Sequence, residues 1–271
     1  MMQRRVRRTV MITAAVCALL YGAIAYLILP AAWKHHEHQP GLADKPMVTQ
    51  TKQGIPGDAL NVGLVGDRTD VLRAMQDAGW FPADPITMKS SLEIIGSVLF
   101  DRPDKDAPVS PLYYDGRVED FAFEKPDGRS ADRRHHVRFW QVLDSGKEGR
   151  PVWLGSVTYD RGVGISHYTG QVTHHISPDI DKERDGLVNG LAAAHVVEAI
   201  YRVSGIGPTL NGRNGEGDRY WTDGEVWIAR LTPGAKKTDV APQVFDPPQI
   251  VQWKNAVMQQ IGNAVGNVIG N

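Results

Sequence analysis

Two stretches of the sequence carry histidines close to charged residues. In the first, residues 133–140 read Arg-Arg-His-His-Val-Arg-Phe-Trp. Side chains alternate across a strand, so a strand here would place Arg134, His136, Arg138 and Trp140 on one face. Two cations and a histidine on one face repel one another unless acidic side chains, a bound anion or solvent lie nearby. Two interpretations are open: this face binds an anion, or it is exposed and an arginine stacks on Trp140.

The second stretch is residues 173–185, which read Thr-His-His-Ile-Ser-Pro-Asp-Ile-Asp-Lys-Glu-Arg-Asp. It places two histidines in a predicted loop directly before a predicted helix that carries aspartates. Imidazole and carboxylate groups are natural ligands for divalent metals, and a His–Asp pair also transfers protons near neutral pH. The candidate catalytic residues are His174, His175, Asp179 and Asp181. Their spacing matches no standard zinc signature such as H-E-x-x-H, and helix capping by Asp179 is the structural alternative.

Further side chains extend these two groups. The candidate ligand-binding set is Arg117, His136, Arg138, Trp140 and Arg184. His167 lies in the same predicted loop as the two histidines and fits either group. The sequence has neither G-x-x-x-x-G-K-[ST] nor G-x-G-x-x-G, so it carries no nucleotide-binding motif. The cofactor stays undetermined, with a divalent metal as one option.

Hydrophobic periodicity predicts the elements that would position these residues. Helical spacing covers three segments: Thr69–Ala78, Thr87–Leu99 and Asp179–Val203. Strand patterns cover five segments: Leu60–Val65, Tyr113–Phe123, His135–Val142, Val152–Tyr159 and Tyr220–Leu231. Asp160–Pro178 is predicted as a loop rich in Gly and His. The expected fold class is α+β, a mostly antiparallel sheet with helices packed on one face, preceded by one N-terminal transmembrane helix.

The N-terminus has the pattern of a membrane anchor. Four arginines within the first eight residues precede Thr9–Leu29, an apolar run without a charged residue. About 20 apolar residues at roughly 1.5 Å each span a hydrocarbon core of roughly 30 Å. Because positive charge stays inside, we expect a single-pass signal-anchored protein with a cytoplasmic N-terminus and a periplasmic or extracellular domain. A signal peptide cleaved near Ala23–Ala25 is the alternative.

The chain divides into four segments by composition. Residues 1–30 hold the arginine cluster and anchor, 31–57 a linker, 58–232 the globular domain, and 233–271 a Pro-containing linker and a tail helix with Gly-Asn repeats. The net charge of −1 gives no reason to expect a nucleic-acid partner. The one cysteine, Cys17, lies in the anchor, which excludes a disulfide or a cysteine-based zinc or redox site in the domain. The expected partners are the lipid bilayer and an envelope phosphatase or transport protein.

Four short motifs together resemble the LssY C-terminal domain family. They are Pro111–Asp120, Arg134–Trp140, Pro151–Ser156 and Thr173–Asp181. The resemblance covers about residues 56–232. In that family the domain occurs alone or fused behind a membrane-embedded phosphatase of the phosphatidic-acid type, and it has no established activity of its own. A search for the phosphatase's arginine, Pro-Ser-Gly-His and Ser-Arg…His blocks finds no convincing match, so the resemblance implies an envelope setting and no mechanism.

Three functions remain open on the sequence. The leading one is an envelope-facing accessory or binding domain for an anionic ligand, such as a phosphate or a lipid head group. The second is an envelope hydrolase that uses a His/Asp site, with or without a metal. The third is a structural scaffold assembled through the Trp-rich strands and the tail. The binding hypothesis requires Arg138 and His174 to share a pocket.

Overall fold

The structure is a computed structural model of the 271-residue chain. It describes residues 2–83, 87, 89, 111–128, 133–168, 170, 172–208 and 211–269. The chain divides into two compact units, Met1–His38 and Gln39–Asn271. Each unit is described by itself.

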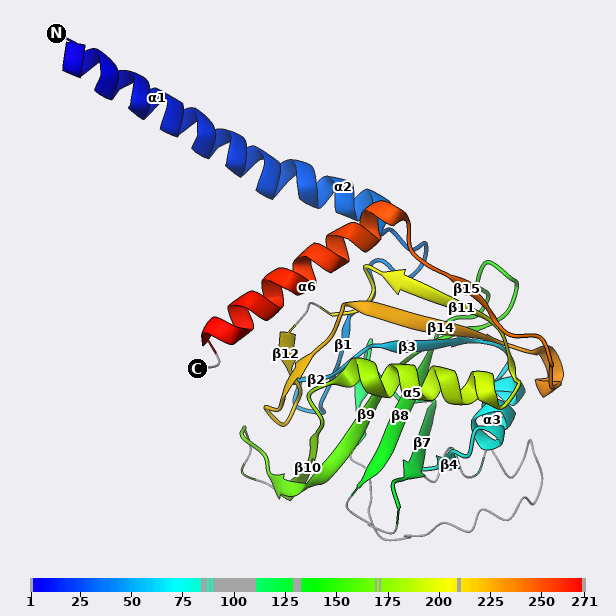
Figure 1. Cartoon of the computed structure of the whole chain (residues 1–271). Helices are drawn as coiled ribbons and strands as arrows, with labels where there is room; N and C mark the ends of the chain where they lie inside the picture. The colour runs from blue at the N-terminus through cyan, green and yellow to red at the C-terminus, as the bar shows by residue number, and fades with distance from the viewer. Residues whose placement is uncertain are drawn as a thin grey trace. The chain divides into compact units, whose positions relative to one another are not determined.

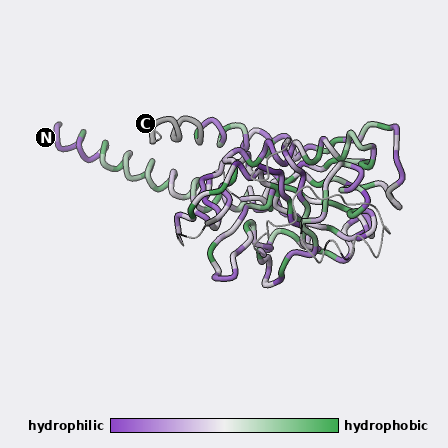
Figure 2. The backbone as a smooth tube through the Cα atoms, turned by 90° about the horizontal axis from the view of Figure 1, so that it is seen from below, coloured by the Kyte–Doolittle hydropathy of each residue, from purple (hydrophilic) through white to green (hydrophobic). Residues whose placement is uncertain are grey.

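The first unit is a continuous helix. It consists of α1 (Met2–Ala23), a π-helical turn η1 (Ile24–Ile28) and α2 (Leu29–His36). Its first turns are hydrophilic and the following turns are mostly hydrophobic (Figure 2). Pro30 cannot donate a backbone hydrogen bond and crowds the preceding turn, which accounts for the π-helical turn before it. Gln3–His36 is long and apolar enough to cross a membrane, so the predicted N-terminal helix is confirmed as a candidate span.

The second unit is built on a large, mostly antiparallel sheet (Figure 1). In the described part of the chain this sheet has nine strands, in the order β15-β11-β14-β3-β9-β8-β7-β4, with β10 paired to β9. The strands are β3 (Val62–Val65), β4 (Phe81–Pro82), β7 (Phe121–Pro126), β8 (Arg134–Leu143), β9 (Val152–Ile165), β10 (Val172–Ile176), β11 (Val197–Ser204), β14 (Glu225–Leu231) and β15 (Gln243–Phe245). The pairs β14–β3 and β11–β15 are parallel. The α+β class with a mostly antiparallel sheet is confirmed.

Two smaller sheets accompany the large one. The first has the order β2-β1-β5-β6 and the second pairs β12 with β13. The strands are β1 (Val48–Gln50), β2 (Pro56–Ala59), β5 (Tyr113–Tyr114), β6 (Arg117–Val118), β12 (Asn211–Arg213) and β13 (Arg219–Trp221). Asp115 and Gly116, at φ 50° and 75°, make the tight turn between β5 and β6. The segment 31–57 thus carries the end of α2, all of β1 and the start of β2.

In the described part of the chain, two helices cover one face of the large sheet. They are α3 (Arg68–Asp77) and α5 (Ile180–Ala193), and both lie on the same side in Figure 1. Their apolar side chains pack against sheet residues that include Val137, Phe139 and Trp153, all 0% exposed. A second apolar cluster contains Trp140 and Leu154 of the large sheet and Tyr114 of the β2-β1-β5-β6 sheet. The large sheet is therefore buried by apolar packing on both faces.

The chain ends with η2 (Pro233–Ala235) and the helix α6 (Gln249–Ile269). Val251 on α6 is 1% exposed, and the side chain of Asn255 donates hydrogen bonds to Ser204 and Glu225. Trp253 and Val257 on the same helix are exposed. The tail helix predicted from the apolar stripe is present, and one of its faces contacts the sheet.

Five sequence expectations differ from the structure or fall outside it. Two predicted strands each cover more than one: Tyr113–Phe123 contains β5, β6 and the start of β7, and Tyr220–Leu231 contains the end of β13 and all of β14. The helix predicted at Asp179–Val203 ends at Ala193, and its second half is the strand β11. The break lies at His195, which is exposed and adopts a left-handed φ of 64° in the turn after the helix. The segment predicted as a loop at Asp160–Pro178 instead contains the end of β9 and β10. The helix predicted at Thr87–Leu99 lies outside the described residues except for positions 87 and 89.

Candidate functional site

Both faces of β8 are buried. Val137 and Phe139 enter the apolar core below the helices. On the opposite face, Arg134, His136 and Arg138 are 7%, 3% and 7% exposed. The alternative of a solvent-exposed face is therefore wrong. Residues of β2, β10 and the turn between β12 and β13 lie over these side chains. Burying two guanidinium groups and an imidazole is costly unless each finds partners, so their surroundings decide what the face can do.

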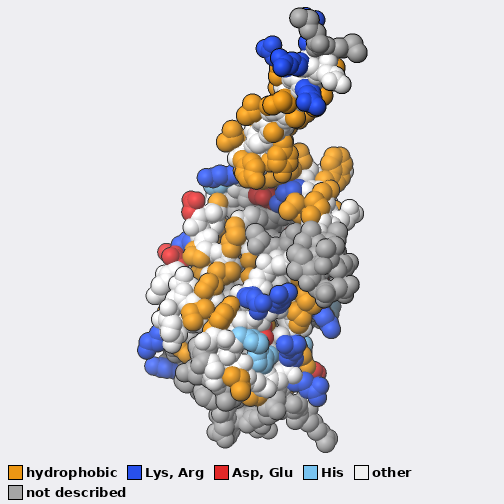
Figure 3. All heavy atoms as spheres, turned by 90° about the vertical axis from the view of Figure 1, so that its left-hand side faces the viewer, with side chains coloured by type: hydrophobic (Ala, Val, Ile, Leu, Met, Phe, Trp, Pro, Cys, Tyr) orange, Lys and Arg blue, Asp and Glu red, His pale blue; other side chains and the backbone are white. Residues whose placement is uncertain are grey.

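A cavity of about 210 Å³ lies against this face. It is bordered by residues of β8, β9, β10, β2 and the turn between β12 and β13, together with Thr51 and Leu112. The polar and charged lining side chains are Thr51, Asp58, Arg134, His136, Arg138, Thr158, Asp160, Thr173, His174, Asn214 and Glu216. Arg138 and His174 thus share a pocket, as the binding hypothesis requires. Figure 3 shows histidine side chains that reach the surface beside arginine or lysine side chains.

Arg134 is held tightly by two carboxylates. Its Nη1 lies 3.1 Å from Glu124 Oε2, and its Nε lies 3.2 Å from Asp160 Oδ2. Asp160 is the cross-strand partner of Arg134 on β9, and Glu124 comes from β7. All three side chains are less than 10% exposed. This buried triad fixes the guanidinium at one end of the cavity and neutralises its charge.

Arg138 lies near two carboxylates. Its Nη1 lies 3.5 Å from Asp58 Oδ2, and its Nε lies 3.6 Å from Glu119 Oε1. Both distances exceed the roughly 2.7–2.9 Å of a charge-assisted hydrogen bond. Burial raises the pKa of Asp58, Arg138 lowers it, and the neighbouring Asp160 raises it further. Burial and the charge of Asp160 thus favour the uncharged form of Asp58.

His136 has a buried ring nitrogen, Nε2, that lacks a hydrogen-bond partner among the described residues. Burial lowers the pKa of His136 well below its usual value, and the charges of Arg138 and Arg134 lower it further, as does His174. The imidazole is therefore neutral at pH 7. It borders the cavity with one ring nitrogen available to a ligand.

The two histidines of β10 diverge. His174 borders the cavity beside His136. His175 instead pairs with Asp218, with 2.8 Å between Nδ1 and Oδ1. The two histidines were predicted in a loop but lie on the strand β10, and successive side chains of a strand point to opposite faces.

The two aspartates of the predicted catalytic set serve α5. Asp179 caps the helix by accepting a hydrogen bond from the backbone N–H of Lys182. Asp181 accepts hydrogen bonds from Thr222 Oγ1 and the backbone N–H of Asp223, and its Oδ1 lies 3.2 Å from Nη1 of Arg184. Neither aspartate is among the described residues that border the cavity. The structure does not bring them to His174.

The predicted ligand-binding set also separates. His136 and Arg138 border the cavity, whereas Trp140 lies in the apolar cluster and donates its Nε1–H to the carbonyl of Arg117. Arg117 itself is exposed on β6 and donates to the carbonyl of Gln141. Arg184 is buried elsewhere, against Asp181, Asp185, Asp223 and the face of Trp227. Two of the five residues therefore form a site.

Sequence reasoning missed the acidic members of the pocket. Asp58 lies at the boundary between the predicted linker and the domain, Asp160 at the start of a predicted loop, and Glu216 in a glycine-rich turn. Asp160 was detectable in principle, because an antiparallel pairing of β8 with β9 places it opposite Arg134. The other two come from segments far along the chain, and local patterns carry no signal for them.

The pocket combines hydrogen-bond donors and acceptors around a neutral imidazole. Arg138 and His136 suit a ligand group that accepts hydrogen bonds, and Asp160 and Glu216 suit a group that donates them. A neutral histidine beside a carboxyl group of raised pKa is also a pair that can exchange protons with a substrate.

Comparison with known proteins identifies one family. A family model described as LssY C-terminus matches residues 40–226, more than half of the chain. No curated protein and no solved structure matches the chain.

Proposed function

The chain belongs to the LssY C-terminal domain family, and we propose that its domain binds a small phosphate-bearing polyol, such as a lipid head group, in the cavity beside His136 and Arg138. One observation carries this proposal. The buried Nε2 of His136 lacks a hydrogen-bond partner among the described residues, although it borders a cavity with Arg138. Leaving such a group unsatisfied costs about 1–3 kcal/mol, a cost that a bound ligand would remove.

The phosphate end of the ligand is supported by Arg138, a cationic side chain that borders the cavity. Its carboxylate neighbours Asp58 and Glu119 lie 3.5 and 3.6 Å away. A phosphate oxygen would accept hydrogen bonds from this guanidinium and from the imidazole N–H of His136. Burial raises the pKa of Asp58 and so favours its uncharged form, which does not repel an anion.

The hydroxyl groups of the ligand are supported by the acidic lining. Asp160 and Glu216 border the same cavity and accept hydrogen bonds. A bare anion would meet repulsion there, whereas a hydroxyl group donates to a carboxylate. The cavity of about 210 Å³ is smaller than the roughly 300–1,000 Å³ of sites for drug-sized ligands, so it suits a head group and not a lipid chain.

The membrane setting is the second part of the proposal. The helix Gln3–His36 is a candidate span, and four arginines precede its apolar run. Because positive charge stays on the cytoplasmic side, we infer a cytoplasmic N-terminus and a domain outside the cytoplasm. There the domain would meet lipid head groups, and an envelope phosphatase or transport protein is the class of partner that would use such a binding domain.

Calorimetric titration of the full chain in a nonionic detergent tests the binding. The ligands are inorganic phosphate, glycerol 3-phosphate, glycerophosphoglycerol and, as the uncharged reference, glycerol. We expect glycerol 3-phosphate or glycerophosphoglycerol to bind more tightly than phosphate, and glycerol to bind weakly or not at all. Preferred binding of free phosphate would point to a phosphate sensor and contradict the head-group assignment.

Two pocket variants and one matched control complete the test. Arg138→Gln and His136→Leu each remove one donor and are expected to weaken binding by about 10-fold or more. Arg117→Gln removes an exposed arginine outside the pocket and is expected to bind as the wild type does. Equal affinity in all four proteins would rule the pocket out. His136→Leu keeps the test valid if removal of Arg138 disturbs folding.

Hydrolysis in the same pocket is the second candidate function. It is favoured by the opposite directions in which burial moves the pKa values of His136 and Asp58. The neutral imidazole would take a proton from water as it attacks phosphorus, and the carboxyl group would protonate the alcohol as its P–O bond breaks. Phosphorus NMR of glycerophosphoglycerol incubated with the protein would then show a growing phosphomonoester signal, lost in Asp58→Asn. An unchanged spectrum with measurable binding would leave binding alone.

A further inference from the structure

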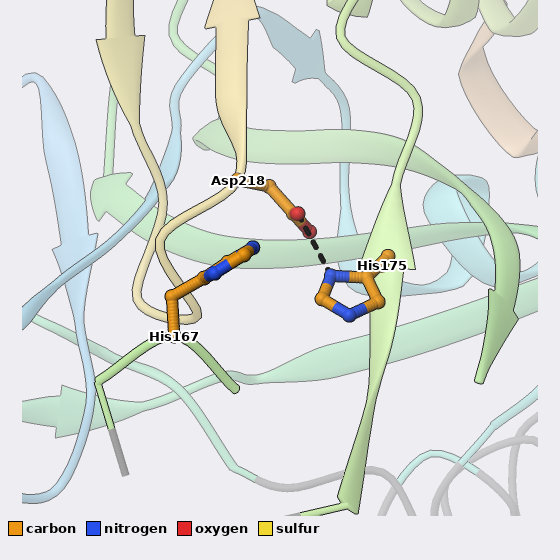
Figure 4. A group of neighbouring side chains, drawn as sticks. All are labelled: His167, His175 and Asp218. Carbon is orange, nitrogen blue, oxygen red and sulfur yellow. Dashed lines mark hydrogen bonds and ion pairs between the residues drawn. The ribbon is translucent and has the colours of Figure 1, made fainter. Parts of the chain in front are cut away.

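Three side chains outside the cavity converge in a second group. His167 follows β9, His175 lies on β10, and Asp218 precedes β13 (Figure 4). Each offers one ligand atom, and these atoms all lie within 4.8 Å of one another. We propose that His167, His175 and Asp218 bind a divalent transition-metal ion of the zinc class.

The three ligand atoms need only a small rearrangement to bind zinc. Zinc bonds of roughly 2.0–2.1 Å in a tetrahedral site place two ligand atoms about 3.3 Å apart. Nδ1 of His175 lies 2.8 Å from Oδ1 of Asp218, so these two atoms would move slightly apart as the metal replaces their hydrogen bond. The ring centroids of His167 and His175 are 5.6 Å apart, so the ring of His167 would move closer. Because His167 is exposed, its ring can move toward the other two without disturbing the core.

Two glycines make room for the histidine rings. A Cβ atom at Gly164, on the strand paired with β10, would overlap the ring of His175. A Cβ atom at Gly217 would lie 2.6 Å from Cβ of His167, and Gly217 also has a φ of +89°. The two backbone segments therefore approach the rings more closely than any other residue would allow.

The carboxylate of Asp218 is held in place. The residue is 4% exposed, and its Oδ2 accepts a hydrogen bond from the backbone N–H of Ile176. Its own backbone N–H donates to Asn214 Oδ1. Nη2 of Arg161 lies 3.9 Å from Oδ1 and opposes a cation, but that side chain is 56% exposed and can turn into solvent. Asp218 is therefore a fixed acidic ligand that an ion can reach once Arg161 turns into solvent.

The ligand set indicates which ion binds. Two imidazoles and one carboxylate suit zinc and neighbouring transition metals, whereas calcium and magnesium prefer oxygen ligands throughout. Three protein ligands leave a fourth position for water. A backbone hydrogen bond from the N–H of His167 to the carbonyl of Glu216 already joins two of the segments.

The metal would tie together the segments that enclose the head-group cavity. His174 and Ile176, on either side of His175, border that cavity, and so do Gly215 and Glu216 before Asp218. A bound ion would cross-link β10 to the β12–β13 turn and stabilise this part of the fold. This role goes beyond the proposed head-group binding, and either one can fail without the other.

Zinc titration of the untagged full chain tests the proposal. The protein is stripped with a chelator and dialysed against Zn²⁺, and bound metal is counted by mass spectrometry. We expect about one zinc per chain, a raised Tm with Zn²⁺, and no comparable effect of Mg²⁺ or Ca²⁺. Co²⁺ should give the visible absorption of a tetrahedral or five-coordinate site, which a merely structural His–Asp hydrogen bond would not produce.

Variants assign the metal to these residues. His167→Ala removes an exposed ring, so it tests the site at little structural cost, and Asp218→Asn removes the negative charge with a similar shape. Each is expected to weaken zinc binding at least about 10-fold. Replacing His35, His36 and His38 together by glutamine removes the other histidine cluster of the sequence and should leave the stoichiometry unchanged. No saturable zinc, or zinc lost only in that triple variant, would overturn the proposal.

Discussion

His136 makes a prediction about stability as well as binding. A ligand-binding side chain that is buried without a partner costs the unbound protein free energy, and an apolar side chain of similar size does not. We expect His136→Leu to raise the free energy of unfolding by about 1–2 kcal/mol at pH 7.5 in the absence of ligand. For a domain of this size that is a rise of a few degrees in Tm, measurable by thermal unfolding of the full chain in detergent.

Acid should enlarge the advantage of His136→Leu. The folded-state pKa of His136 lies below its usual value, so the unfolded chain takes up a proton first as the pH falls below about 6.5. The wild type therefore loses stability toward acid in that range, and the variant lacks this contribution. The neighbour His135 serves as the matched control, since it pairs with Glu183 at 2.6 Å and His135→Leu should be destabilising. A loss of stability in both variants would show that His136 is an ordinary structural residue.

Which site residues share a face could be predicted from the sequence where this depends only on the alternation of side chains along a strand. Alternation along β8 correctly grouped Arg134, His136 and Arg138 on one face. It could not tell that this face is buried, because the covering segments come from β2, β10 and the β12–β13 turn. It also extended the site to Trp140, which lies further along the same face, where apolar residues replace the polar ones. The partner of His175 is Asp218, 43 residues later, and no local spacing announces that pair.

At the scale of elements, the start of α5 is joined to the β13–β14 turn by charges. The guanidinium of Arg184 is 2% exposed and contacts Asp181 and Asp223 at 3.2 and 2.8 Å. Burial raises the pKa of Asp181 to about 6, against the lowering effect of Arg184, and Asp223 raises it further. Ionising Asp181 in the folded protein is therefore harder than in the unfolded chain, despite the nearby cation.

The pH dependence of Asp181→Asn tests this balance. Between pH of about 4 and 6 the folded protein holds a proton on Asp181 that the unfolded chain releases. The stabilising contribution of Asp181 is thus present at low pH and lost as the pH rises through about 6. We expect the stability of wild type relative to Asp181→Asn to fall by on the order of 2 kcal/mol from pH 4 to pH 7.5, measured by chemical unfolding.

Lys182→Gln is the control for this measurement. It removes a charge from an exposed position on the same helix without removing a carboxyl group, so its difference from wild type should not change over the range. A difference between wild type and Asp181→Asn that stays constant or grows with pH would mean that the contact with Arg184 outweighs burial.

The boundary between α5 and β11 shows where element prediction failed. Val196, Val197, Ile200, Tyr201 and Val203 are β-branched or aromatic residues that favour strands. Their apolar spacing also continued the helical pattern, and neither Gly nor Pro separates the two elements. His195 supplies the left-handed turn usually made by glycine, so the break carries no conventional signal. The strand β3, the helix α3 and the tail helix α6, in contrast, could be predicted, because the apolar residues of each follow one period without interruption.

At the scale of the whole molecule, the two proposed sites depend differently on the membrane. The proposed zinc site needs only the folded unit, whereas the proposed head-group site would gain its ligand from proximity to a bilayer. A tethered domain meets lipid head groups at a high effective concentration, so even a weak affinity in free solution would be sufficient for binding. The orientation of the span therefore decides which leaflet and which compartment supply the ligand.

Single-cysteine labelling tests this orientation. The chain has one cysteine, Cys17, in the candidate span, and Cys17→Ala removes it. In that background a membrane-impermeant maleimide applied to intact cells should label Lys237→Cys, at an exposed position of the second unit. It should label Gln3→Cys, before the apolar run, only after lysis. The physical reason is that the arginines next to Gln3 resist transfer across the bilayer. Labelling of Gln3→Cys alone would reverse the orientation, and labelling of both or of neither in intact cells would remove the membrane-spanning arrangement from which the head-group proposal draws its ligand.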